Sequence, residues 1–282
     1  MSDEIQGGAA GNDSAGTATE AAKNERVSEP SPLVSLVIPV YNEADHLERF
    51  LEVIDAIKLP AEKELIFIDD CSRDGSREIL QAYKFKSKVQ ILLQPQNCGK
   101  GAAIRRGLEA AVGTVIGVQD ADFEYEPSDI PTLVTPLLEG KAEAVFGSRF
   151  SRGGNQVHRT LHYLVNLLLT TMSNLLSGLY LSDMETCYKF FRADVIKNVM
   201  LESDRFGFEP EVTAKVARLK LRVMEFPISY FPRNYIEGKK ITWRDGIAAL
   251  RHIVYFNLFV PQEKCFTKDL PNRFIPRGGN WL

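Results

Sequence analysis

Two aspartates in the run Asp120-Ala121-Asp122 follow a short apolar segment at Val115–Val118, and Glu124 comes soon after them. The apolar segment is short and built from Val, Ile and Gly, which predicts a buried strand. In an open α/β sheet, ligands bind just beyond the carboxyl ends of the strands. Two carboxylates at such a strand end can hold a hard divalent cation through their oxygen atoms. A solvated acidic turn would carry the same short motif, so the interpretation depends on the rest of the chain.

Acidic residues also follow two earlier predicted strands. Glu43 comes after the strand predicted at Val34–Val40, and Asp69 ends the strand predicted at Glu64–Asp69. Two further strands are predicted, at Val89–Leu93 and Glu143–Gly147, with helical segments between the strands. This alternation predicts an α/β fold with a mostly parallel sheet flanked by helices. Because carboxylates accept hydrogen bonds from sugar hydroxyls and from base N–H groups, acids at one sheet edge suit a nucleotide sugar.

Several other chemistries lack their motifs. The end of the first strand and the turn after it read Pro39–Glu43 and contain no G-x-G-x-x-G loop, which argues against a dinucleotide fold. Gly101 follows Lys100 where a Walker motif requires Ser or Thr, and no G-x-S-x-G elbow occurs. The net charge of -3 argues against a nucleic-acid partner. The four cysteines form no C-x-x-C pair, which favours neither a zinc site nor a disulfide framework.

Composition divides the chain into three parts: a disordered tail at residues 1–32, a folded domain at 33–260 and a C-terminal tail at 261–282. The first part has no apolar core, so we do not interpret it as a secretory signal. The scattered cysteines fit a reducing cytosol, so we expect a cytoplasmic protein. Leu161–Leu181 contains no charged residue and has an apolar stripe at helical spacing. We expect an amphipathic helix that packs on the sheet, with a place in the membrane interface as the alternative. Leu250–Val260 offers a second apolar surface, so a peripheral position on the cytosolic face of a membrane is also open.

Five motifs in this order carry a family resemblance: P-V-Y-N-E (Pro39–Glu43), I-D-D-x-S-x-D-G (Ile68–Gly75), N-x-G-K-G-A-A (Asn97–Ala103), D-A-D (Asp120–Asp122) and G-S-R (Gly147–Arg149). Together they resemble the inverting family-two glycosyltransferases, which have the GT-A fold. Within that family the chain is most similar to the branch of dolichyl-phosphate mannose synthases and polyprenyl-phosphate glycosyltransferases. The resemblance extends over residues 33–257. The Q-x-x-R-W signature of processive polysaccharide synthases is absent, so the resemblance implies transfer of a single sugar.

The resemblance implies roles for individual residues. The base and ribose of the donor would lie against Pro39, Tyr41, Glu43 and Asp69. A Mg²⁺ or Mn²⁺ ion would lie at Asp120 and Asp122, with Asp122 as the direct ligand and Glu124 where relatives often have a Gln ligand. Lys100 and Ala121, inside the matched motifs, count as substrate-binding residues. The diphosphate and the acceptor phosphate would be bound by Arg149, Lys189, Arg233 and Lys239 or Lys240. Cys187 stands where relatives commonly have Gly.

The reaction that these roles imply is transfer of one hexose from a GDP- or UDP-sugar to a polyprenyl phosphate. A metal on Asp122 would offset the charge of the leaving group, and Arg233 would meet the acceptor phosphate. A phosphate acceptor needs no strong base, whereas a sugar hydroxyl would need one, with Asp183 or Glu185 as candidates. Either acid could instead be a helix cap or a structural ion-pair partner.

Three alternatives remain. The same catalytic core could act on a soluble carbohydrate, protein or small-molecule acceptor. A nucleotidyltransferase would use similar acids and a metal but would release pyrophosphate. A silent nucleotide-sugar binding module would bind donor and metal without turnover. The sequence leaves the sugar, the base and the oligomeric state open.

Overall fold

A computed structural model describes residues 31–150, 160–232 and 243–276. Contacts divide the chain between Ser31 and Pro32, and the second unit contains every helix and strand described below. Residues 1–30 of the expected N-terminal tail lie outside the described residues. Arg233, Lys239 and Lys240 also lie outside them.

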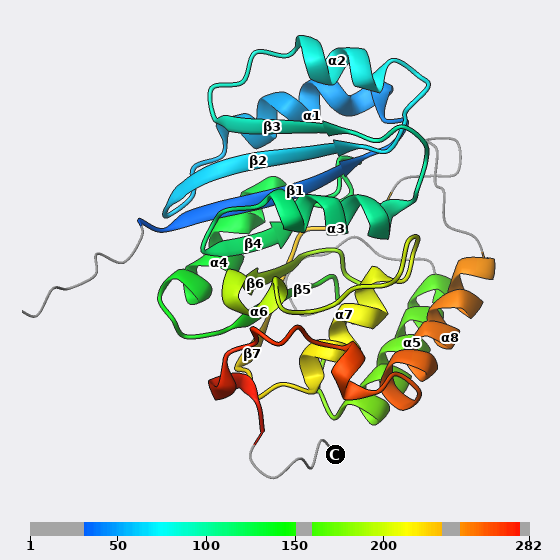
Figure 1. Ribbon diagram of the computed structural model, residues 1–282. Coiled ribbons are helices and arrows are strands. Elements are labelled where there is room, and N and C mark those ends of the chain that lie inside the picture. Colours follow the sequence, from blue (N-terminus) through cyan, green and yellow to red (C-terminus); the bar gives the residue numbers. More distant parts are fainter. Residues whose placement is uncertain (1–30, 151–159, 233–242, 277–282) are drawn as a thin grey trace, which may run out of the picture. The chain divides into compact units, whose positions relative to one another are not determined.

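The centre of this unit is a seven-stranded sheet in the order β3-β2-β1-β4-β6-β5-β7 (Figure 1). The strands are β1 (Leu33–Val40), β2 (Glu62–Asp69), β3 (Lys88–Leu93), β4 (Val115–Val118), β5 (Ala144–Ser148), β6 (Lys189–Arg192) and β7 (Val223–Pro227). All pairs are parallel except those of β6, which runs antiparallel to both β4 and β5. In register, Asp69 lies opposite Val40 on one side and Leu93 on the other, so these three strands end together at one edge. The prediction of an α/β fold with a mostly parallel sheet is confirmed.

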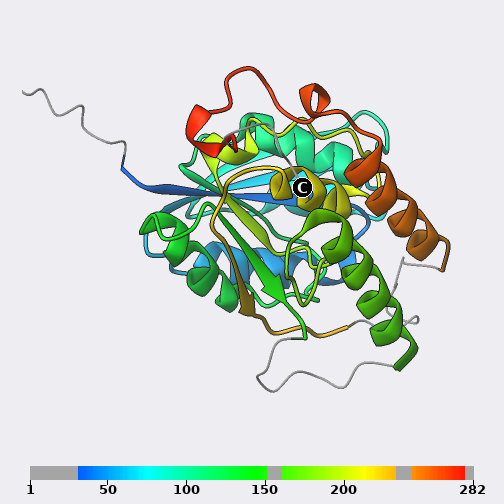
Figure 2. The same cartoon turned by 90° about the horizontal axis from the view of Figure 1, so that it is seen from below.

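Helices cover both faces of the sheet. They are α1 (Ala44–Ala56), α2 (Ser76–Ala82), α3 (Lys100–Ala110), α4 (Ile130–Leu138), α5 (Thr160–Ser177), α6 (Ala193–Ile196), α7 (Phe208–Ala217) and α8 (Trp243–Leu258), with short 3₁₀ helices at Pro127–Asp129, Gln262–Lys264 and Asn272–Phe274. The two views agree that α3 covers one face of the sheet, while α1 and α4 cover the other (Figures 1 and 2). On α1 the buried side chains Leu47, Phe50, Leu51 and Ile54 recur at helical spacing, as an amphipathic helix requires.

A glycine lets α3 approach the sheet closely. A β-carbon on Gly107 would lie 2.3 Å from Cγ1 of Val37 on β1 and 2.7 Å from Cδ1 of Ile68 on β2. Since no side chain fits at that distance, only glycine allows α3 to pack at its observed depth. This packing determines where the first turn of α3 meets the carboxyl edge of the sheet.

The packed domain continues past residue 260, where we expected a C-terminal tail to begin. Cys265, Phe266, Leu270 and Phe274 are buried in the core. The amide of Lys220 donates a hydrogen bond of 2.8 Å to the carbonyl of Phe274, which fixes this segment beside α7. Residues 261–276 are therefore part of the folded domain. A few scattered apolar residues at wide spacing have no periodic pattern, which is why composition alone favoured a tail.

In the described residues, none of the helices combines the length and the apolar character that crossing a membrane requires. Helices α5 and α8 lie side by side beyond the carboxyl ends of the parallel strands (Figures 1 and 2). The carbonyls at the end of α8 receive hydrogen bonds from Arg218, which follows α7: its guanidinium donates to Phe256 (2.7 Å), Asn257 (3.1 Å) and Val260 (2.7 Å). A cation at this end also suits the helix dipole.

Candidate active site

The predicted acidic strand ends lie in the loops at the carboxyl edge of the sheet. Asp69 ends β2, Glu43 follows β1 and caps α1, and the Asp120–Asp122 run follows β4. Pro39, Tyr41 and Asp122 are partly exposed beside them, whereas Ala121 is buried. The loops after β1 and β2 are tied together, since the amide of Asn42 donates to Ser72 Oγ at 3.0 Å and that of Glu43 to Ser76 Oγ at 2.8 Å.

Asp69 and Asp70 are adjacent but have different partners. Asp69 is fully buried and accepts hydrogen bonds from Arg77, with Nε at 2.7 Å and Nη2 at 2.6 Å. Asp70 accepts four, from Gln94 Nε2 (2.8 Å), Asn97 Nδ2 (2.9 Å) and the amides of Cys98 (2.7 Å) and Gly99 (2.8 Å). Asp70 therefore holds the turn that starts α3, which links the I-D-D motif to the N-x-G-K motif. No motif in the sequence indicated this structural role of Asp70.

Lys100 connects two carboxylates. Its Nζ lies 3.0 Å from Asp120 Oδ2 and 3.0 Å from Glu209 Oε1, at the start of α7. Burial alone would lower the pKa of Lys100, but the two carboxylates hold it well above its ordinary value, so the ammonium stays charged. Glu209 lies in the run F-G-F-E-P-E (Phe206–Glu211), and its contact with Lys100 was not predicted from the sequence.

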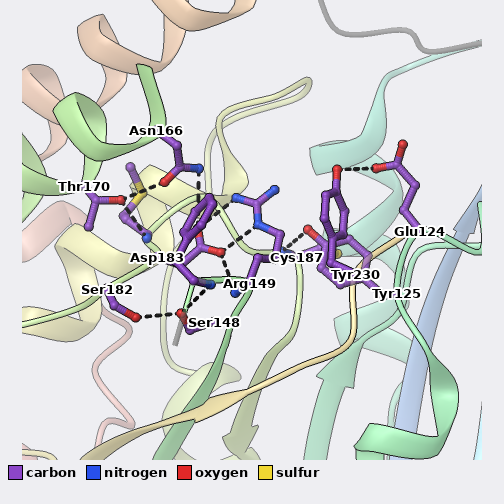
Figure 3. A network of polar contacts seen from close by, with 12 residues as sticks. Glu124, Tyr125, Ser148, Arg149, Asn166, Thr170, Ser182, Asp183, Cys187 and Tyr230 are labelled. Atoms are coloured by element: carbon purple, nitrogen blue, oxygen red, sulfur yellow. Dashed lines mark hydrogen bonds and ion pairs between the residues drawn. The ribbon is translucent and has the colours of Figure 1, made fainter. Parts of the chain in front are cut away.

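The acids proposed for the metal differ in their surroundings. Asp122 Oδ1 accepts from the amide of Glu124 at 3.1 Å. Glu124 is buried, and its Oε2 accepts from the Tyr230 hydroxyl at 2.8 Å (Figure 3). Within the described part of the chain, no group of three or more His, Cys, Asp or Glu side chains is arranged to hold a metal ion. Asp120 and Asp122 are nevertheless suitable ligands for Mg²⁺ or Mn²⁺, because both side chains offer carboxylate oxygens and both are partly exposed at the end of β4. Such ions take their remaining ligands from water and from substrate phosphates.

Arg149 follows β5 and forms a two-pronged ion pair with Asp183 (Figure 3). Arg149 Nε lies 2.6 Å from Asp183 Oδ2, and Nη2 lies 2.8 Å from Oδ1. Burial alone would raise the pKa of Asp183, but the charge and hydrogen bonds of Arg149 hold it below its ordinary value. A carboxylate held in this way is a weak base. The geometry therefore favours a role for Asp183 in positioning Arg149.

Aromatic side chains lie between the acidic and basic parts of the site. The Tyr125 ring lies 5.0 Å from that of Tyr188 and 5.3 Å from that of Tyr230, and the Arg149 guanidinium lies 5.1 Å from the Tyr230 ring centre. The amide of Cys187 donates to the Tyr125 hydroxyl at 3.2 Å. Burial and nearby Asp120 raise the pKa of the Cys187 thiol well above its usual value, so this sulfur is a neutral packing group.

Lys189 and Glu185 occupy the segment that leads into β6. Lys189 is fully buried, with Nζ 2.9 Å from the Met184 carbonyl and 4.1 Å from the centre of the Phe146 ring. Burial lowers its pKa to about 8. Phosphate binding by Lys189 stays a prediction. Glu185 Oε1 is shielded from solvent and has no hydrogen-bond partner among the described residues, and burial together with the charge of Glu209 raises its pKa to about 7.

A protein-family comparison matches the model described as "Glycosyl transferase family 2" to residues 35–200. The chain is 32% identical over 211 residues to the undecaprenyl-phosphate 4-deoxy-4-formamido-L-arabinose transferase of Aeromonas hydrophila, covering 73% of this chain and 62% of that protein. It is 30% identical over 249 residues to the dolichyl-phosphate beta-glucosyltransferase of Trichomonas vaginalis, covering 81% and 75%. For the undecaprenyl-phosphate mannosyltransferase of Micrococcus luteus, identity is 30% over 216 residues, covering 73% and 86%.

Solved structures give the same fold. A glucosyl-3-phosphoglycerate synthase from Mycobacterium tuberculosis, solved with Mn²⁺, UDP and glucosyl-3-phosphoglycerate, aligns with a TM-score of 0.60 at 17% identity, covering 81% of this chain and 80% of that one. At this identity the likeness shows the fold alone, which is the GT-A α/β fold that the motifs implied. The family match and the curated relatives agree with the strand-end motifs, and the chain belongs to glycosyltransferase family 2.

Proposed function

We propose that this protein is a metal-dependent inverting glycosyltransferase that moves one hexose from a GDP- or UDP-sugar to a polyprenyl phosphate. The observation that carries the proposal is that β4 and β5 both run antiparallel to β6, so the Asp120–Asp122 carboxylates after β4 and Arg149 after β5 lie at the same edge of the sheet. Carboxylates can hold a metal-bound diphosphate, and a fixed guanidinium can bind a second phosphate. The names of the relatives support a polyprenyl-phosphate acceptor, since they act on undecaprenyl or dolichyl phosphate.

Asp120 and Asp122 would hold Mg²⁺ or Mn²⁺, which supplies Lewis-acid stabilisation of the departing diphosphate. The neighbouring synthase structures that contain Mn²⁺ or Mg²⁺ support this choice. Lys100, which keeps a positive charge beside Asp120, would contact the same diphosphate. Pro39, Tyr41, Glu43 and Asp69 would contact the base and ribose. Their positions beside β1 and β2 support that assignment.

Among the described cations, Arg149 would bind the acceptor phosphate. Asp183 fixes the plane of its guanidinium, and the rings of Tyr230 and Phe150 lie 5.1 and 5.5 Å from it. An acceptor phosphate is already a nucleophile, so attack on the anomeric carbon requires no base from the protein. Arg233, Lys239 and Lys240 remain proposals for the same anions, from sequence alone. The proposed place of action is the cytosolic face of a membrane.

One observation favours a second candidate, transfer to a hydroxyl group of a soluble acceptor. Glu185, whose pKa is raised to about 7, could take a proton from a hydroxyl at neutral pH. In that case Glu185→Gln should abolish transfer. With a phosphate acceptor the same variant should retain most activity.

The test is an assay of purified protein with GDP- and UDP-hexoses, a polyprenyl phosphate, and Mn²⁺ or EDTA. We expect lipid-linked sugar and free GDP or UDP with one donor class, and none after chelation. Asp122→Ala should fold normally and lose turnover. Release of pyrophosphate would indicate a nucleotidyltransferase. Binding of donor without any product would indicate a silent module, and an unchanged rate in Asp122→Ala would contradict the metal assignment.

A further inference from the structure

Tyr230 lies just after β7, in a segment whose backbone is bonded to two parts of the candidate site. The amide of Ile228 donates to the carbonyl of Ser148, which ends β5, at 3.0 Å. The amide of Phe231 donates to the carbonyl of Glu124, in the loop after β4, at 2.8 Å. Tyr230 lies between these two bonds and is 9% exposed. Its backbone is therefore held between the end of β5 and the loop that carries the acidic residues.

The side chain of Tyr230 contacts the same two parts of the site through different groups. Its hydroxyl donates to Glu124 Oε2 at 2.8 Å, as Figure 3 shows. The guanidinium carbon of Arg149 lies 5.1 Å from the centre of its ring, within the range of a cation–π contact. The ring of Tyr125 packs against the same side chain, with 5.3 Å between the two ring centres. One residue thus contacts a carboxylate of the proposed metal loop and the cation proposed for the acceptor phosphate.

These contacts continue beyond Tyr230 in both directions. The amide of Glu124 donates to Asp122 Oδ1 at 3.1 Å, and Arg149 Nε lies 2.6 Å from Asp183 Oδ2. A continuous set of contacts therefore joins five residues: Asp122, Glu124, Tyr230, Arg149 and Asp183. Energetic coupling between two binding sites is carried by packed and hydrogen-bonded side chains of this kind.

The two contacts of the Tyr230 side chain depend on different atoms. The ring faces Arg149 and Tyr125, and a phenylalanine ring would keep both contacts. The bond to Glu124 uses the hydroxyl, which phenylalanine lacks. A hydrogen bond to a carboxylate is roughly twice as strong as one between neutral groups. Removal of this single oxygen therefore separates the link across the site from the packing of the ring.

We propose that Tyr230 is a positioning residue that couples the metal and donor part of the site to the acceptor part. Its hydroxyl holds Glu124 on the loop of Asp122, and its ring holds the guanidinium of Arg149. A ligand in either part fixes this shared side chain, so the second ligand has less of the protein to order and binds more tightly. The inference rests on the proposed function for the identity of the two ligands, a metal–nucleotide at the acids and a phosphate at Arg149.

The experiment is isothermal titration of the full chain with Mn²⁺–GDP and with Mn²⁺–UDP, each without and with a saturating short, water-soluble isoprenyl phosphate. A nucleoside diphosphate carries no sugar, so no transfer disturbs the titration. For the nucleotide that binds, we expect the isoprenyl phosphate to lower the dissociation constant about fivefold or more. Tyr230→Phe should bring this ratio of dissociation constants close to one. A loss that is only structural would weaken nucleotide binding equally in both titrations and leave the ratio unchanged.

Tyr188→Phe is the matched control, because it removes the hydroxyl of a neighbouring ring in the same aromatic cluster. That hydroxyl lies 2.5 Å from Gln119 Oε1 and 3.0 Å from the carbonyl of Glu126. The ratio for this variant should equal that of the unaltered protein. Glu124→Gln keeps an oxygen that can accept from Tyr230 and should keep the coupling, whereas Glu124→Ala should lose it. Thermal unfolding of each variant confirms that it is folded.

The double variant Tyr230→Phe/Glu124→Ala tests the contact itself. If both residues act through one hydrogen bond, the double variant should change the ratio no more than either single variant does. Equal ratios for the unaltered protein and Tyr230→Phe would overturn the coupling, and so would the same loss in Tyr188→Phe. Sugar transfer to a polyprenyl phosphate would then still support the proposed function. Coupled binding without transfer from any sugar donor would leave the role of Tyr230 in place and contradict the proposed function.

Discussion

Arg149 and Asp183 form a buried ion pair in which each charge depends on the other. Replacing Asp183 by Asn keeps the shape but leaves the guanidinium without a counter-charge. We expect Asp183→Asn to lower the free energy of unfolding by roughly 3–5 kcal/mol, the usual cost of breaking a buried pair. Transfer should fall as well, because the plane of Arg149 is no longer fixed. Urea unfolding and initial rates measure the two effects.

The matched control for this pair is Asp194→Asn. Asp194 pairs with Arg192 at 3.0 Å, but both side chains are about a third exposed. Exposed pairs contribute about 0–1 kcal/mol, so this variant should unfold almost as the unaltered protein does. If Asp183→Asn and Asp194→Asn lowered the free energy of unfolding equally, burial of the Arg149–Asp183 pair would add nothing to the cost of breaking it.

Glu185 gives a prediction for the dependence of stability on pH. Its pKa in the folded state is raised from an ordinary 4.5 to about 7, so the folded state binds this proton more tightly than the unfolded state does. The contribution of Glu185 to the free energy of unfolding is therefore fully present below its ordinary pKa of 4.5, and it is lost as the pH rises toward 7. Between about pH 5 and about pH 8, the free energy of unfolding should therefore fall less for Glu185→Gln than for the unaltered protein. Urea titrations at both pH values test this, with the exposed Glu109→Gln as control; parallel pH curves for Glu185→Gln and the unaltered protein would contradict it.

The residues that could be predicted from the sequence are those whose local pattern carries the information. Asp69, Asp120 and Asp122 stand where apolar runs end, so the strand-end site was visible. Their partners were not visible, because Lys100 and Glu209 are 109 positions apart and Tyr230 and Glu124 are 106 apart. No short motif encodes a contact over that distance. The ion pair of Asp183 with Arg149 likewise became apparent only from the folded chain.

At the scale of elements, alternating strands and helices up to β5 were predictable because each has a clear period. β6 and β7 were not predicted. β6 has only four residues, and no local pattern indicates that it pairs antiparallel with β4 and β5. The amphipathic segment in α5 illustrates a further limit. Some of its apolar residues, such as Leu169, pack in the core, and others, such as Leu168, are exposed. The predicted alternatives, packing on the sheet or a place in the membrane interface, therefore each described only one side of the helix.

The first turn of α3 gives a prediction at this scale. A β-carbon on Gly101 would lie 2.1 Å from the carbonyl oxygen of Ser203, and the amide of Ala102 donates to the Asp204 carbonyl at 3.1 Å. Gly101→Ala must push α3 away from this segment and move Lys100. We expect a loss of about 1–3 kcal/mol in stability, as for other overpacked sites, and weaker donor binding.

The control for that variant is Gly246→Ala on α8, where the nearest atom to a new β-carbon is Val165 Cγ1 at 3.9 Å. In an open helical position, Ala should stabilise by up to about 1 kcal/mol relative to Gly. Thermal unfolding distinguishes the two substitutions. A neutral Gly101→Ala would show that the Ser203 segment yields without cost.

At the scale of the whole molecule, the folded domain depends on the residues after α8 as well as on the sheet. Phe274 is 3% exposed, its carbonyl bonds Lys220, and it lies in the segment that follows the expected boundary at residue 260. Phe274→Ala should therefore lower the free energy of unfolding by about 3–5 kcal/mol, as for other buried phenylalanines. Asn272→Ala, two residues away and exposed, should change it by no more than about 0.5 kcal/mol. Both variants can be compared by urea unfolding, and similar small effects would mean that residues 261–276 act as a tail after all.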